Sequence, residues 1–259
     1  MPGNAAELAE DRNMLELYHA EPGANSLKSM LCLKEKGLDF VSHYLNLAEF
    51  EQHDPEFVRI NPNGQVPALV HNGQVITEST LINEYIEDVF PQPPLRPADP
   101  VARWQMRFWT KFVDEYFCPA LSVLGWQQII KPMVEHLTEE EFEAKIARIP
   151  LKEQRDKWRT AATQSFPQEQ LDECTYKVNV SLGKIEKALA INRWVAGPEF
   201  TLADISCFAM MSPMPMFYSA VMNEKHTPQC MDWHARMMER PAVIETLAMA
   251  HKPLPTSAR

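Results

Sequence analysis

The hydrophobic and polar positions of the first ninety residues predict short strands that alternate with helices. Leu15 and Leu17 are separated by polar residues, as in a strand with one buried face. A Pro-Gly dipeptide follows, and apolar positions then recur at helical spacing as far as Gly37, a residue suited to ending a helix. Asn25 or Ser26 is expected to cap the N-terminus of this helix.

Three more strands and two more helices complete this predicted block. Residues 40–45 form the second strand, residues 55–60 a short helix, and residues 66–70 and 74–77 two apolar runs. An Asn-Gly dipeptide joins the runs and suits a type I′ hairpin, whose two central residues need positive φ. Apolar residues then mark one face of a helix over residues 81–90. A parallel pair followed by an antiparallel hairpin indicates an α/β domain of the thioredoxin type.

A proline-rich stretch over residues 91–97 predicts a boundary between two domains. We assign residues 14–90 to the α/β domain and 91–100 to a linker. Residues 101–259 are assigned to an all-α C-terminal domain, because strand signals almost vanish after the linker. The first thirteen residues are polar and are expected to form a flexible extension. Residues 131–170 are strongly charged and predict a helical excursion or a long ordered loop.

Composition narrows the possible partners and the compartment. The formal net charge of −10 argues against a nucleic-acid or anionic-membrane surface, because either needs clustered lysine and arginine. No apolar run approaches the length of a bilayer span. The five cysteines are scattered and never form a Cys-x-x-Cys pair, as expected of reduced thiols in a cytoplasmic protein. The eight histidines show no metal-ligand spacing, so no metal site is expected.

Two short motifs in the α/β block carry the candidate chemistry. Gln65-Val66-Pro67 precedes a predicted strand, and a proline commonly starts a strand because its missing N–H does no harm there. Glu78-Ser79 begins a helix, whose N-terminus and serine hydroxyl suit a carboxylate while Glu78 suits an ammonium group. An ordinary capped helix would also explain Ser79. The two motifs face each other across a hairpin, which favours a functional site.

Together these motifs resemble those of the glutathione transferase family. The resemblance implies that Pro67 follows a cis peptide bond, and that the backbone of Val66 holds the cysteinyl part of the co-substrate glutathione like an added strand. It implies a contact between Gln65 and the carboxylate end of the peptide. It also assigns Glu78 and Ser79 to the γ-glutamyl group.

The residue that activates the thiol is expected between the first strand and the first helix. Because the thiolate is the nucleophile, Ser26 at a helix N-terminus could stabilise it by a hydrogen bond without acting as a base. Asn25 could do the same through its amide, and either residue could be only the helix cap. Gln52 and His53 fall where the family often reaches the glycyl carboxylate, and a solvated loop histidine is the alternative.

The helical block supplies the remaining expectations. Thr201 and Asp204 form a capping-box pattern, an element that the family carries in its C-terminal domain for folding. A pocket for the second substrate is expected to use aromatic and apolar side chains, although more aromatic residues on helices belong to a core than to a pocket. The candidates are Tyr18, Trp109, Phe112, Tyr116, Trp126 and Met216.

Longer stretches resemble one subgroup, the bacterial glutathione-dependent β-etherases of the S-selective type, which cleave β-aryl ethers derived from lignin. The resemblance implies that glutathione thiolate attacks the β-carbon beside a ketone and releases a phenol, and that the protein is a homodimer. A broad-specificity detoxifying transferase is the nearest alternative, and a non-catalytic binding or scaffold protein is an alternative of another class. The stretches are residues 23–28, 35–38, 76–80, 109–118, 166–169 and 200–205.

Overall fold

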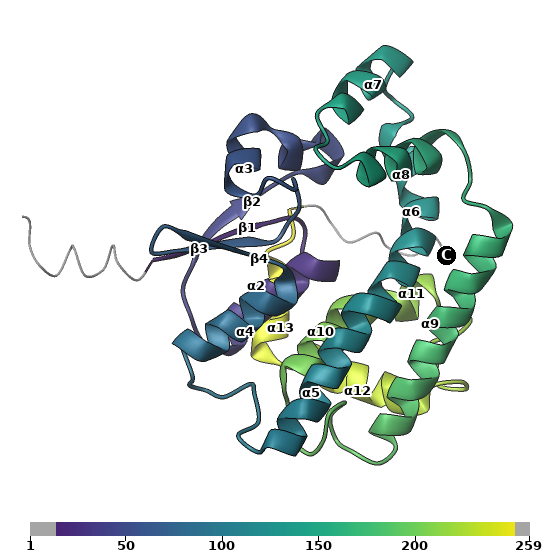
Figure 1. Cartoon of the computed structure of the whole chain (residues 1–259). Helices are drawn as coiled ribbons and strands as arrows, with labels where there is room; N and C mark the ends of the chain where they lie inside the picture. The colour runs from purple at the N-terminus through teal and green to yellow at the C-terminus, as the bar shows by residue number, and fades with distance from the viewer. Residues whose placement is uncertain (1–13, 252–259) are drawn as a thin grey trace, which may run out of the picture.

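A four-stranded mixed sheet organises the N-terminal part of the computed structural model, which describes residues 14–251 (Figure 1). β1 (Leu15–His19) pairs in parallel with β2 (Val41–Tyr44) and antiparallel with β3 (Ala68–His71). β3 in turn pairs antiparallel with β4 (Gln74–Thr77), so the strand order is β2-β1-β3-β4. The predicted extension over residues 1–13 lies outside the described residues.

Helices cover both faces of the sheet. α2 (Ala24–Glu35) and α4 (Ser79–Val89) lie on one face and share a core with the buried leucines of β1. α3 (Pro55–Ile60) lies on the other face, after the short turns η1 (Leu47–Glu49) and η2 (Glu51–His53) (Figure 1). This arrangement confirms the predicted thioredoxin-like fold of the N-terminal part.

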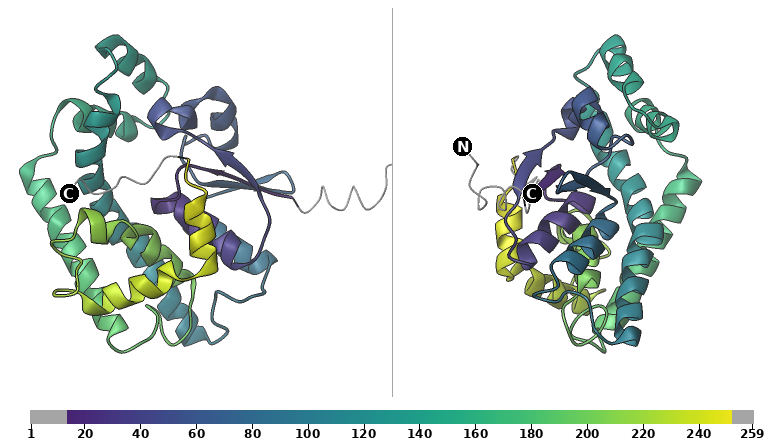
Figure 2. Two further views of the ribbon diagram at one scale, coloured as in Figure 1. Left: turned by 180° about the vertical axis from the view of Figure 1, so that it is seen from behind. Right: turned by 60° about the vertical axis from the view of Figure 1, so that its left-hand side comes forward.

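The described residues of the C-terminal part form helices and connecting loops but no strand, apart from one isolated bridge between Trp194 and Gly197. α5 (Pro100–Phe112) continues through a π-helical turn, η3 (Val113–Phe117), into α6 (Cys118–Val134). The remaining helices are α7 (Glu139–Ala147), α8 (Lys152–Thr163), α9 (Gln168–Leu189), α10 (Leu202–Met211), α11 (Met214–Phe217), α12 (Pro228–Met238) and α13 (Pro241–Ala248). α13 returns to lie along α2 (Figure 2), so both parts share one core. Within residues 14–251, no helix combines the length and apolar character of a bilayer span.

The buried carboxylate of Asp204 organises the start of α10, every residue of which is buried. Its Oδ1 accepts hydrogen bonds from the Val195 N–H at 2.9 Å and from Trp233 Nε1 at 3.1 Å. Its Oδ2 accepts the Thr201 N–H at 3.0 Å and completes the capping box that the sequence predicts. Burial raises the pKa of this carboxyl to about 6, while the donors from Val195, Thr201 and Trp233 favour its charged form.

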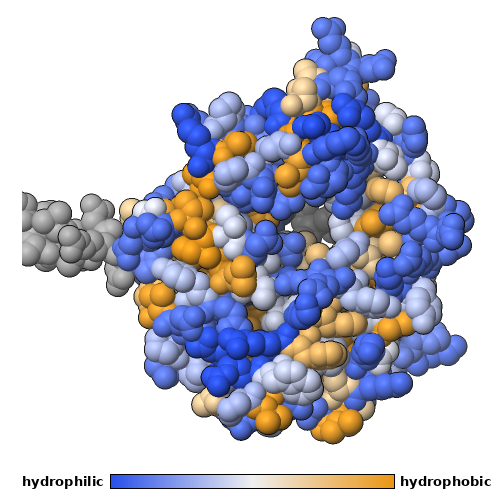
Figure 3. Space-filling model, in the orientation of Figure 1, coloured by the Kyte–Doolittle hydropathy of each residue, from blue (hydrophilic) through white to orange (hydrophobic). Residues whose placement is uncertain are grey.

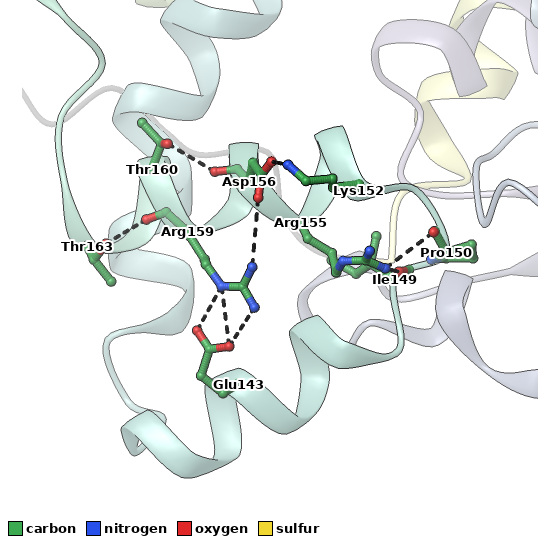
Figure 4. A network of polar contacts seen from close by, with 9 residues as sticks. All are labelled: Glu143, Ile149, Pro150, Lys152, Arg155, Asp156, Arg159, Thr160 and Thr163. Atoms are coloured by element: carbon green, nitrogen blue, oxygen red, sulfur yellow. Dashed lines mark hydrogen bonds and ion pairs between the residues drawn. The ribbon is translucent and has the colours of Figure 1, made fainter.

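The charged segment 131–170 forms α7 and α8 rather than a long loop. A capping box between Thr138 and Glu141 starts α7, and Arg159 of α8 forms a forked ion pair with Glu143 of α7 (Figure 4). The two helices share a second hydrophobic cluster with the end of α6, and Phe50 from the α/β domain packs in it against Trp158. The segment is therefore an ordered addition that contacts the sheet domain.

Three local predictions differ from the structure. The N-cap of α2 is Gly23, so Asn25 and Ser26 both lie inside the first turn of the helix. β3 begins at Ala68, because Pro67 has no N–H to donate to the ladder. The helical pattern over residues 228–250 is broken into α12 and α13, because a proline inside a helix removes a hydrogen bond and clashes with the preceding turn. The Asn-Gly hairpin is confirmed, with both residues at positive φ.

Candidate functional site

The loop before β3 leaves a free backbone edge. The Val66-Pro67 peptide bond is cis, and Asn61 Nδ2 holds this loop by donating to the Gln65 carbonyl at 2.6 Å. Within the described residues, neither the N–H nor the C=O of Val66 takes part in a hydrogen bond. Such a pair of free groups beside a sheet is able to accept an extended peptide as an additional strand.

The N-termini of α2 and α4 converge next to this edge. Ser79 is the first residue of α4, and its Oγ lies 3.5 Å from Asn25 Oδ1 in the first turn of α2. Glu78 precedes it with φ 66° and ψ 110°, a conformation rare for a residue with a side chain, and strain of this kind clusters at functional sites. Two helix N-termini side by side offer positive dipole ends to an anion, and the exposed Glu78 carboxylate offers a partner for a cation.

The two candidates for thiol activation are in different environments. The Asn25 side chain is half-buried, and its amide spans from Ser79 to Cys118, where Nδ2 lies 4.0 Å from Sγ. Ser26 is buried, and its Oγ accepts the Ala20 N–H at 3.0 Å, which ties the end of β1 to α2. Asn25 is therefore the more accessible side chain at this helix N-terminus.

A second group of polar side chains lies on the far side of the Val66 edge. Gln52 and His53 in η2 are each 6% exposed, and neither Gln52 Oε1 nor His53 Nδ1 has a hydrogen-bond partner among the described residues. Burial lowers the pKa of His53 to about 4, and the nearby Arg148 charge acts in the same direction. Gly64 packs on this imidazole at φ +61°, and a Cβ there would lie 2.5 Å from Nδ1. A bound polar ligand or water would satisfy these groups.

The α7–α8 segment holds that loop in place. Phe50, next to η2, is fully buried against Trp158 of α8, with ring centroids 4.4 Å apart. The turn between α7 and α8 also contributes Arg148, which pairs with Asp54 and donates to the Phe50 carbonyl. The loop that carries Gln52 and His53 is thus positioned by the helical part as well as by the sheet.

A π-helical turn packs against the N-terminal half of α2. In η3, Asp114 pairs with Lys28 of α2 at 2.5 Å, and Cys118 follows one turn later beside Asn25. Lys28 has no exposed side-chain surface, whereas the Asp114 side chain is 36% exposed. Burial raises the pKa of the Cys118 thiol, and the Lys28 charge opposes that effect. π-Helical turns are rare and occur frequently at functional sites.

The aromatic residues predicted to line the second-substrate pocket do not all come together. Tyr18 lies on the face of the sheet away from α2, where its ring stacks on His43 with centroids 4.3 Å apart. Phe112 and Tyr116 stack on each other beneath lysine side chains of α9. Each aromatic residue precedes Asp114 or Cys118 by two residues, so the aromatic pair lies on a different side of the helix from those two residues. Trp109 is 9% exposed and packs in the core. The structure therefore does not bring all four of these side chains together, and a role for them in a substrate pocket stays a prediction; helical spacing alone does not say which face of a helix meets which neighbour.

Trp126 and Met216 remain as candidates. Trp126 is on α6, eight residues after Cys118, and Met216 on α11 is 43% exposed. Figure 3 shows a hollow between the sheet domain, the α7–α8 segment and the helices of the C-terminal part. Sequence reasoning missed Lys28, Asp114 and Cys118, although Asp114 and Cys118 have the spacing of one helical face. No three His, Cys, Asp or Glu side chains of residues 14–251 gather as metal ligands.

Comparisons with known proteins agree with this geometry. Residues 13–88 match the glutathione S-transferase N-terminal domain, and residues 140–241 match the glutathione S-transferase C-terminal domain. Protein LigF of Sphingobium sp. is 46% identical over 237 residues, which cover 89% of this chain and 92% of LigF. Glutathione S-transferase 3 of Zea mays is 29% identical, over 94% of this chain and 98% of the maize protein.

A solved structure gives the same result in three dimensions. The crystal structure of the β-etherase LigF from Sphingobium sp. strain SYK-6 superposes with a TM-score of 0.88 and 45% identity, over 91% of this chain and 99% of that chain. The free Val66 edge, the paired helix N-termini and both domain matches lead to one conclusion. The chain belongs to the glutathione transferase family, with glutathione as its co-substrate.

Proposed function

We propose that this protein uses glutathione to cleave β-aryl ether bonds in lignin-derived aromatic ketones. The observation that carries the proposal is the similarity to the β-etherase LigF over nearly the whole length of both chains, together with a TM-score of 0.88. The glutathione thiolate attacks the β-carbon beside the ketone, and a phenol leaves. Such a displacement needs a stabilised thiolate, in-line placement of the two reactants and a pocket for aromatic rings.

Glutathione is proposed to bind along the convergent surface described above. Val66 holds the cysteinyl backbone, with Gln65 and Pro67 shaping the edge. Ser79 and Glu78 hold the carboxylate and ammonium of the γ-glutamyl group. Support comes from the free backbone groups and from the two helix N-termini.

The opposite end of the peptide is proposed to meet Gln52 and His53 through its glycyl carboxylate. Support comes from His53 Nδ1, which is buried next to Gly64, has no partner among the described residues and can donate when it carries the proton. Gln52 would donate through its amide Nε2. The low pKa of His53 keeps its imidazole neutral at pH 7, so it acts as a neutral donor.

Asn25 is the proposed stabiliser of the thiolate, since its amide is half-buried beside Ser79 and Cys118. Ser26 contributes mainly by anchoring α2 to the end of β1 through the Ala20 N–H. We expect the double variant Asn25→Ala plus Ser26→Ala to slow turnover with little loss of glutathione affinity. Asn25→Ala alone is expected to account for most of the decrease in turnover.

Chiral chromatography of a racemic β-aryl ether ketone, incubated with enzyme and glutathione, tests the proposed reaction. Release of the phenol together with depletion of one enantiomer supports it, and the S enantiomer is the expected substrate. Turnover of chlorodinitrobenzene without any ether cleavage would instead identify a broad detoxifying transferase. No binding of glutathione at millimolar concentration would favour a scaffold protein.

A homodimer is the proposed assembly. Exposed apolar side chains gather on neighbouring parts of β4, α4 and α5, and single-chain surfaces rarely leave such a group uncovered. Light scattering after size-exclusion chromatography measures the mass. The cytoplasm is the proposed compartment, because all five cysteines are free. The exposed residues are Val75, Leu81, Val101, Trp104 and Phe108, with exposed fractions of 44%, 61%, 63%, 62% and 45%.

A further inference from the structure

One side of α6 carries three residues that lead away from the thiol end of the site. Cys118, Ser122 and Trp126 occupy positions i, i+4 and i+8 of this helix, and side chains four residues apart lie on the same side. The line begins beside Asn25, whose Nδ2 is 4.0 Å from Cys118 Sγ. Each step of four residues advances about 6 Å along the helix axis.

Lys157 of α8 reaches this line from the α7–α8 segment. Its Nζ donates to Ser122 Oγ at 2.9 Å and lies 4.2 Å above the centroid of the Trp126 ring. Cation and ring at this distance attract each other, and the contact fixes the ammonium at the wall formed by α6.

Lys157 has no acidic partner within residues 14–251, unlike Lys152 and Arg159 of the same helix. Lys152 pairs with Asp156, and Arg159 pairs with Glu143, as Figure 4 shows. Among the described residues, no carboxylate forms an ion pair with Lys157. An ammonium carries three N–H donors, and the bond to Ser122 uses one of them.

Burial also changes the acidity of this group. It lowers the pKa of the Lys157 ammonium, while the thiols of Cys118 on α6 and Cys174 on α9 act in the opposite direction. An ammonium with a lowered pKa is a better general acid at neutral pH than an ordinary surface lysine. The position thus combines a fixed donor with an increased tendency to release its proton.

The spacing fits an in-line displacement. The attacking sulfur approaches the β-carbon at about 3 Å, and the leaving oxygen lies one bond further on the opposite side. A donor to that oxygen sits about 3 Å beyond it. Lys157 is bonded to Ser122, which lies one four-residue step of α6, about 6 Å along the helix axis, beyond Cys118, the neighbour of Asn25.

We propose that Lys157 is a catalytic residue that assists the departure of the phenol in the proposed ether cleavage, on which this inference rests. A sulfur lone pair forms the C–S bond, the bond from the β-carbon to oxygen breaks, and its electron pair moves to the aryl oxygen. The Lys157 ammonium donates a proton to that oxygen. The products are the thioether and a neutral phenol, and the amine regains a proton from the solvent, which received one when the glutathione thiol ionised.

The test compares Lys157→Met and Lys157→Arg with the wild-type enzyme on a series of β-aryl ether ketones whose phenols differ in acidity. Losing one donor to a developing oxyanion lowers kcat by about 100-fold or more. Lys157→Met is therefore expected to lose about 100-fold on a guaiacol ether and less than about 5-fold on a 4-nitrophenol ether, whose phenolate leaves without help. Lys157→Arg retains part of the activity because it keeps a charged donor.

Two controls accompany the series. Lys152→Met changes a well-exposed lysine on the same helix and is expected to leave every rate unchanged. Conjugation of chlorodinitrobenzene releases chloride rather than a phenolate, so Lys157→Met is expected to keep this activity within about 2-fold. Thermal unfolding of each variant checks that the fold is retained.

Equal losses on every ether, or no loss on any, overturn the role of Lys157 while the proposed function stands. If the wild-type enzyme conjugates chlorodinitrobenzene but cleaves none of the ethers, the proposed function fails and the role of Lys157 fails with it. A steeper dependence on phenol acidity in Lys157→Met than in the wild type, restored in part by Lys157→Arg, is the supporting result.

Discussion

The ion pair between Lys28 and Asp114 allows an asymmetric prediction about stability. It joins α2 of the sheet domain to η3 of the helical part, next to the thiol end of the site. The Lys28 side chain has no exposed surface, whereas the Asp114 side chain is 36% exposed. Removing Asp114 therefore leaves a charge that water does not reach, and removing Lys28 leaves one that water does.

The magnitudes follow from this difference in burial. Breaking a buried pair by deleting one partner costs about 3–5 kcal/mol. Neutralising an ordinary lysine at pH 7 costs about 5 kcal/mol. The loss of stability on removing Asp114 cannot exceed this value, because the lysine can give up its proton instead of staying charged. We expect Asp114→Ala to lower the free energy of unfolding by about 3–4 kcal/mol and Lys28→Met by about 1 kcal/mol, because methionine keeps the apolar stem and Asp114 stays hydrated.

Urea unfolding at fixed protein concentration measures both variants. Glu115→Ala is the matched control, since Glu115 lies in the same turn and pairs with Lys111 at the surface, and we expect its effect to stay within about 0.5 kcal/mol. Equal losses in the two single variants would refute the reasoning.

Three further predictions concern the site and the core. Glu78→Gln is expected to raise the KM for glutathione about 10-fold at nearly constant kcat, because the carboxylate contributes a charge partner on binding; an unchanged KM in steady-state assays contradicts its role. His53 has a pKa of about 4 in the folded state, against an ordinary value near 6.5. The unfolded state therefore takes up a proton first as the pH falls below about 6.5, and the folded protein loses stability down to about pH 4. Urea titrations are expected to show a loss of roughly 2–3 kcal/mol between pH 7 and pH 4 in the wild type but not in His53→Gln. Asp204→Asn is expected to lower the free energy of unfolding by about 2–4 kcal/mol. The new amide N–H₂ would face N–H groups of the backbone or of Trp233, which now donate to the carboxylate. A loss below about 1 kcal/mol in chemical unfolding contradicts that account.

Local patterns were sufficient for most of the α/β domain. Alternation at Leu15 and Leu17, the Asn-Gly hairpin and the helical stripe after Ser79 each depend on a few neighbouring residues, and all three are confirmed. The capping box at Thr201 is of the same kind, since its hydrogen bonds run between residues three apart. The cis bond before Pro67, implied by resemblance, is also present.

The orientation of the side chains on η3 and at the start of α6 depended on tertiary contacts that no periodicity encodes. Phe112 and Tyr116 share a helical stripe that packs against α9, and Asp114 and Cys118 on another side contact α2. The proposed preference for Asn25 over Ser26 also rests on the fold, because the Ala20 N–H that engages Ser26 comes from outside the helix. Propensity describes a residue and its near neighbours, whereas exposure depends on what packs against it.

The sequence by itself determined the fold class, the positions of the glutathione motifs and the family, because these reside in short runs such as Gln65-Val66-Pro67 and Glu78-Ser79. Only the tertiary structure decided which charges are buried and what they meet. Lys28 and Lys157 are ordinary lysines in the sequence, each on a predicted or plausible helix. In the fold, Lys28 is buried in an ion pair because η3 places Asp114 against it. Lys157 lies beside Ser122 and has no carboxylate partner among the described residues, because the facing side of α6 carries a hydroxyl and an indole ring instead.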